Sequence, residues 1–189
     1  MSARPPSSSV ILFVLRFALL APLCLALWWL ILPWYASALG FATRLMLNRF
    51  IEHPIDHVAV ETAGLLNTSS ALAFGAAGHE RRIAVGQLVS NMAPYIALVL
   101  ATRGLRVRRR IGALAVGAAV LIACHGLYLG LAYTWADSIA AHPQLPTALA
   151  QLFLTLPFLL WITLVYWPLF LGKGSRQPGT EPGGAENGD

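Results

Sequence analysis

The stretch RGLRVRRR, residues 103–110, lies between two apolar segments and contains five arginines: Arg103, Arg106, Arg108, Arg109 and Arg110. Short loops rich in Lys and Arg stay on the cytoplasmic side of a membrane. We therefore expect this arginine cluster to determine the topology, with the apolar segments on its two sides crossing a bilayer in opposite directions.

The composition also indicates a membrane protein. Of 189 residues, 57% are hydrophobic and only 11% are charged, whereas a soluble domain needs more polar surface to cover its core. The net charge of +5 does not indicate nucleic acid, because the arginines gather in short runs between apolar segments. The two cysteines, Cys24 and Cys124, provide neither a disulfide framework nor a metal-ligand spacing, and no cofactor is predicted.

About 20 apolar residues are needed to cross the hydrocarbon core of a bilayer. The segments that meet this requirement predict a mainly α membrane protein with four transmembrane helices, at about 10–33, 86–102, 111–133 and 149–171. Residues 1–9 and the Gly/Pro-rich residues 172–189 would then be cytoplasmic, the latter as a disordered tail. We expect a multi-pass membrane protein.

The apolar character continues after Pro33, through residues 34–49. These residues form either a helix at the outer interface, with Arg44, Asn48 and Arg49 in water, or a continuation of the first span; we expect the former. Residues 36–38 also match the A-x-A pattern of a signal-peptide cleavage site. The apolar run before them is longer than the usual core of about 7–15 residues, which argues against cleavage.

Residues 50–84 predict a small extracytoplasmic β-rich module of two or three strands between the first two spans. Val58, Val60 and Thr62 would fall on one side of a strand, while Gly75 and Gly78 are expected to interrupt the segment that follows. His53, His57 and Glu61 would share one face of a strand, but they spread over more than about 20 Å, too far for one metal ion. No metal site is predicted.

In IACHGLYLG, residues 122–130, a thiol precedes an imidazole within an apolar segment. Neighbouring helical residues point about 100° apart, so Cys124 and His125 do not form a nucleophile–base pair with each other. We expect His125 to form a hydrogen bond between helices. A membrane-embedded cysteine hydrolase or transpeptidase that uses both residues stays an alternative, as does a small transporter subunit.

Small residues repeat along the third span, at Ala115, Ala119 and Ala123 and in the pair Gly126 and Gly130. Such faces allow helices to approach closely in a bilayer.

Unpaired polar groups are costly in lipid. We therefore select, as partner contacts or polar-cavity residues, the following: His79, Glu80, Gln87, Asn91 and His125.

The strings RFALLAPLCLALWWLILPW (16–34) and SNMAPYIALVLATRG (90–104), the β-rich segment between them and the basic turn resemble the exosortase H-associated membrane protein family. The resemblance covers about residues 10–171. Exosortases are membrane enzymes that process proteins with a C-terminal sorting signal and that use a Cys, an Arg and a His. Aligned on that pattern, the expected cysteine would lie near Gln87 or Leu88, where this chain has no thiol. The resemblance thus implies a non-catalytic accessory protein of the bacterial inner membrane. Its expected partners are membrane lipid and a membrane protein, the sorting enzyme or its substrate.

Overall fold

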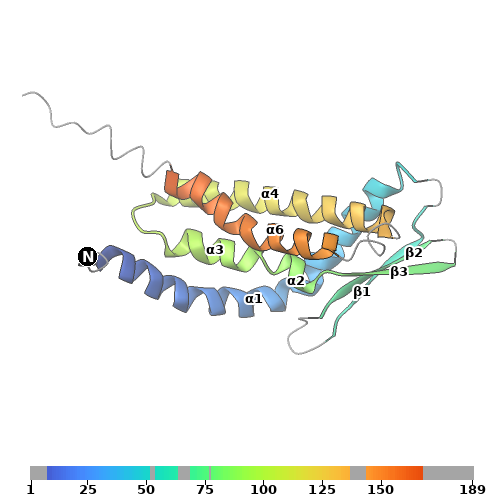
Figure 1. Cartoon of the computed structure of the whole chain (residues 1–189), viewed down its shortest axis with the longest axis horizontal. Coiled ribbons are helices and arrows are strands. Elements are labelled where there is room, and N and C mark those ends of the chain that lie inside the picture. The colour runs from blue at the N-terminus through green and yellow to red at the C-terminus, as the bar shows by residue number, and fades with distance from the viewer. Residues whose placement is uncertain (1–7, 52–53, 64–68, 77, 137–143, 168–189) are drawn as a thin grey trace, which may run out of the picture.

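The computed structural model describes residues 8–51, 54–63, 69–76, 78–136 and 144–167. Helices lie side by side along the molecule, and a small sheet packs at one end of them (Figure 1). The start of α1 (Ser8–Leu47) and the turn between α3 (Met92–Ala101) and α4 (Val107–Thr134) lie at the other end. Two helices are long and apolar enough to cross a membrane, Val10–Leu47 and Val107–Thr134. The predicted class, mainly helical with a small sheet, is confirmed.

The first helix is longer than the sequence predicted. α1 spans Ser8–Leu47, 40 residues, without a break at Pro22 or Pro33, which corresponds to about 60 Å. A separate interfacial helix after Pro33 is therefore wrong. A proline inside a helix removes a single backbone hydrogen bond, so the helix can continue past it. α1 packs against α3, and its buried residues on the two sides of Pro33 include Leu32, Ala36, Leu39 and Thr43.

The predicted β-rich module is confirmed as a three-stranded antiparallel sheet in the order β1-β2-β3. The strands are β1 (His57–Glu61), β2 (Ala71–Ala76) and β3 (His79–Ala84). Gly78 has a φ of 79° and lies in the turn before β3, a conformation that favours glycine. Gly75, in contrast, does not interrupt the strand, since it pairs with His57 and Glu80 in the centre of the sheet.

Several contacts attach the sheet to the helices, among them one at Gly40 and one at Arg81. Gly40 of α1 faces the sheet, where an added Cβ would crowd Val58 and Leu72. From β3, Arg81 Nη1 donates to the backbone oxygen of Tyr133 at 2.7 Å, and its guanidinium lies 5.6 Å from the Tyr133 ring centroid. The carbonyls in the last turn of a helix lack intrahelical partners and attract cations. Arg81 therefore caps the end of α4.

The segment after α1 is tied back onto that helix. Asn48 Oδ1 accepts the backbone N–H of Ile55 at 2.8 Å, and Asn48 Nδ2 donates to the Ile55 oxygen at 3.3 Å. Arg44 Nε donates to the same oxygen at 2.9 Å. Arg44 and Asn48 are half-buried, so the expectation that they lie in water is met only in part, because the buried backbone of Ile55 requires partners. Arg49 is exposed as expected.

The predicted second span, 86–102, is two helices. α2 (Gly86–Val89) and α3 (Met92–Ala101) are separated at Ser90 and Asn91. The predicted third span, 111–133, corresponds to α4 (Val107–Thr134), which begins four residues earlier than expected. Arg108, Arg109 and Arg110 consequently belong to its first turn instead of a loop. The turn before it contains Gly104, with a φ of 80°.

The fourth predicted span, 149–171, also begins earlier. α6 (Gln144–Trp161) starts inside the expected outer loop and continues as a π-helical turn, η2 (Ile162–Tyr166). Residues 168–171 of that span, and the tail 172–189, lie outside the described residues.

Tyr95 of α3 packs on α4 at a glycine that the sequence did not single out, Gly117. Tyr95 Oη donates to the Ala113 oxygen at 2.5 Å, and an added Cβ at Gly117 would overlap the phenol ring. Of the predicted small residues, Gly130 contacts Met46 of α1, whereas Ala115, Ala119 and Ala123 are exposed.

Candidate functional site

The most buried polar side chain of the helical region is His125, which is 0% exposed in the middle of α4. Its Nδ1 lies 2.7 Å from Tyr35 Oη of α1. Its Nε2 lies 3.0 Å from Oδ1 of Asn91, the residue between α2 and α3. The structure thus brings together two of the residues selected from sequence, Asn91 and His125, and adds Tyr35, which was not among the selected residues.

The donor and acceptor in each of these hydrogen bonds can be assigned from a further bond that Asn91 makes. Asn91 Nδ2 donates to the backbone oxygen of Phe153 in α6 at 3.2 Å, so Asn91 Oδ1 is the acceptor for His125. Nε2 therefore carries the proton, and Nδ1 accepts from the Tyr35 hydroxyl. The imidazole is neutral in this arrangement, and each of its nitrogens has a partner. We call Tyr35, His125, Asn91 and the Phe153 carbonyl the polar chain.

Phe153 can accept this bond because of a proline. In an α-helix its oxygen would accept the N–H of the residue four positions later, which is Pro157 and has no N–H. Asn91 supplies the missing donor. The break between α2 and α3 lets the Asn91 side chain, 4% exposed, bind two other helices. The polar chain therefore joins α1, α4 and α6 to the α2–α3 break.

The order phenol, imidazole, amide also occurs in sites with a nucleophile, a base and an orienting group. Here, however, the three side chains bind one another between packed helices. Phe153 stacks against the imidazole, with ring centroids 6.0 Å apart, and Tyr35 meets it edge-on. A substrate would have to separate the helices to reach either nitrogen of His125. The arrangement is suited to holding helices together.

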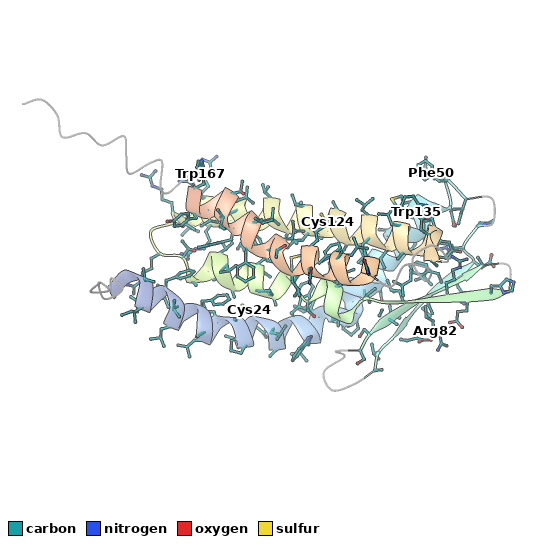
Figure 2. All side chains as sticks on the ribbon, viewed as in Figure 1. Cys24, Phe50, Arg82, Cys124, Trp135 and Trp167 are labelled. Carbon is teal, nitrogen blue, oxygen red and sulfur yellow. The ribbon has the colours of Figure 1, made fainter. Side chains whose placement is uncertain are left out.

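The two cysteine thiols do not belong to the polar chain. Cys124 is half-buried on a neighbouring face of α4, and Cys24 belongs to α1 (Figure 2). Within the described residues, the side-chain bonds of His125 go to Tyr35 and Asn91 and not to a cysteine. The sequence argument that Cys124 and His125 point in different directions agrees with this geometry.

The other selected residues are not part of the polar chain. His79 and Glu80 are exposed in β3, on the sheet. Gln87 belongs to α2, but its side chain lies outside the described residues. His53, one of the three potential zinc ligands, also lies outside them, and among the described residues no group of three metal-ligating side chains occurs.

A second polar group lies on the side of the sheet that faces away from the helices. Arg82 Nη2 lies 3.1 Å from Glu61 Oε1 and 3.7 Å from Glu80 Oε2. These side chains are 63%, 40% and 46% exposed. They lie on the two strands that flank β2, and the residues of β2 on this side are small. His57 covers Gly75 of β2. We call this surface the charged sheet face; it consists of His57, Glu61, Glu80 and Arg82.

The arginine cluster lies at the end of the molecule opposite to the sheet. Arg103, Arg106, Arg108 and Arg109 are exposed. Arg110 is half-buried and donates from Nη2 to the Thr102 oxygen at 3.0 Å. The Thr102 hydroxyl accepts Nε1 of Trp161 at 2.9 Å. The end of α3, the start of α4 and the end of α6 are joined by these bonds.

In the comparisons with known proteins, no family model, curated protein or solved structure matches the chain.

Proposed function

We propose that the protein is a non-catalytic accessory component of an exosortase-type protein-sorting system in the bacterial inner membrane. In this proposal the chain crosses the membrane four times, with both termini in the cytoplasm and the sheet outside. The observation that carries it is the polar chain: the buried histidine has both nitrogens engaged by neighbouring helices. A histidine whose two ring nitrogens both bond to neighbouring helices holds the bundle together and has no nitrogen free for a substrate.

The partner surface in this proposal is the charged sheet face. Its ionic side chains are well exposed, so they can exchange their present partners for those of another protein at low cost. The side chains in the centre of the sheet are small, which leaves the surface flat. Asn48 and Arg81 hold the connecting segment and the sheet on the helices, so a protein bound to the sheet would also be held at the membrane.

Co-purification from the source cells in mild detergent tests this function. The full chain should recover an exosortase-type enzyme or its substrate. Arg82→Glu would place a third acidic residue beside Glu61 and Glu80, and we expect it to lower recovery at least about tenfold, since like charges across an interface cost several kcal/mol. Arg49→Glu is the matched control, because Arg49 is also exposed and lies beyond the sheet-side end of α1.

Two outcomes would contradict the proposal. Absence of any sorting enzyme or substrate with the unaltered chain would remove its basis. Equal recovery with Arg82→Glu and Arg49→Glu would remove the charged sheet face as the contact.

The four-span topology is tested separately, with single cysteines placed in a Cys24→Ala/Cys124→Ala chain in intact cells. An impermeant thiol reagent should label Ala59→Cys on the sheet and leave Val107→Cys, at the start of α4, unlabelled. Both positions are exposed in the structure, so burial does not explain a difference. Labelling at position 107 would reverse the proposed orientation.

A further inference from the structure

The start of α4 concentrates positive charge where a helix tolerates it least. Arg106 is the N-cap, the first turn holds Arg108, Arg109 and Arg110, and this turn has neither an acidic residue nor a side-chain cap. The N-terminus of a helix carries partial positive charge and favours anions. Arg106 also stands three and four positions before Arg109 and Arg110, a spacing at which like charges repel. Among the described residues, no carboxylate of this turn compensates the charge.

The described carboxylates lie far from this turn. They are Asp56, Glu61 and Glu80, which belong to the sheet or directly precede it, and the sheet lies at the opposite end of the helices (Figure 1). Glu61 and Glu80 pair with Arg82. Negative charge for the arginine cluster must therefore come from outside the described part of the chain.

The surface beside the arginines indicates what carries that charge. Val107 and Ile111, one helical turn apart, are 71% and 60% exposed, and the exposed apolar face of α4 continues from them toward the sheet. Arg110 is held in place by Thr102, while its Nε has no hydrogen-bond partner among the described residues. Guanidinium groups above an exposed apolar stripe match a molecule with a phosphate at one end and a hydrocarbon chain at the other.

We propose that the arginine cluster binds the phosphate groups of anionic phospholipids, with the acyl chains lying along Val107 and Ile111. Arginine suits this role because its planar donors bind two phosphate oxygens at once. The bound phosphates supply the negative charge that the first turn of α4 lacks. This site is at the opposite end from the charged sheet face and does not depend on any protein partner.

Native mass spectrometry of the full chain in non-ionic detergent tests the proposal. The chain is offered equal amounts of dioleoyl phosphatidylglycerol and dioleoyl phosphatidylcholine, and the ratio of bound lipids is measured. We expect phosphatidylglycerol to dominate. Arg106→Gln/Arg109→Gln should lower the ratio about fivefold for each arginine removed, while Arg103, Arg108 and Arg110 remain to keep the topology.

Arg49→Gln/Arg82→Gln is the control, because it removes the same charge at the other end of the molecule and should leave the ratio unchanged. A ratio near one for the unaltered chain, or an equal loss in both variants, would overturn the proposal. Inorganic phosphate added in excess should not displace the lipid; displacement would assign the site to free phosphate instead.

Discussion

The polar chain and the charged sheet face both consist of polar side chains, but they differ in burial. His125 and Asn91 are enclosed by helices, and their hydrogen bonds go to partners on other helices. Glu61, Glu80 and Arg82 are more than a third exposed and pair within the sheet. A buried polar group that loses its partner cannot turn to water, whereas an exposed one can.

This difference in burial distinguishes the polar chain, which supports the fold, from the charged sheet face, which we propose for recognition. The polar chain contributes to holding the helices in one arrangement, and each link is costly to remove. The ion pairs of the charged sheet face are exposed and contribute little to stability, and in our proposal this face binds the partner. Substitutions in the two regions should therefore have opposite effects on folding and on partner recovery.

The largest loss of stability is expected at the close approach beside the polar chain. Gly117→Ala would force a methyl group into the Tyr95 ring and should cost about 1–3 kcal/mol through overpacking. Gly126→Ala on the same helix is the control, since an added Cβ there meets nothing within 4 Å. Unfolding in bicelles measures both, and equal stability of the two variants would contradict the α3–α4 packing.

Removing the imidazole should cost nearly as much. His125→Leu leaves the Tyr35 hydroxyl and Asn91 Oδ1 without their partner, and we expect a loss of about 1–3 kcal/mol. The double variant His125→Leu/Asn91→Leu should lose less than the sum of the two single changes, because the residues are in contact. Cys124→Ala is the control for the adjacent position. Additive losses would show that the polar chain is not a unit.

A smaller effect is expected where the sheet meets the helices. Arg81→Gln keeps a hydrogen-bond donor but removes the charge at the end of α4, a favourable term of about 0.3–1 kcal/mol. Hydrogen exchange should then speed up in β3 and in the last turn of α4 and stay unchanged in α3. Faster exchange throughout the molecule would mean that Arg81 supports the whole fold and not the attachment of the sheet.

The smallest effect on stability is expected on the charged sheet face itself. Arg82→Ala removes two exposed ion pairs, and we expect at most about 0.5 kcal/mol, decreasing further at high salt. The same variant should reduce partner recovery. If Arg82→Ala destabilises the protein as much as His125→Leu does, the contrast between the two regions is wrong.

Some of the candidate site was predictable. Asn91 and His125 stand out as polar residues in apolar segments, and both belong to the polar chain. Pro157 could have pointed to the free carbonyl of Phe153, because a proline always leaves the carbonyl four residues earlier without its helical donor. Tyr35 carried no such signal: a tyrosine near tryptophans at the end of an apolar run also fits a membrane interface.

The sequence by itself determined the helical class, the small sheet and the position of the arginine cluster between two apolar segments, because these follow from composition, periodicity and charge order along the chain. Only the tertiary structure decided that α1 continues past Pro33, that the helix after the sheet breaks at Asn91, and that Tyr35 bonds to His125. The physical reason is that a proline, a polar side chain or a glycine has several tolerated local conformations, and contacts between distant residues select among them.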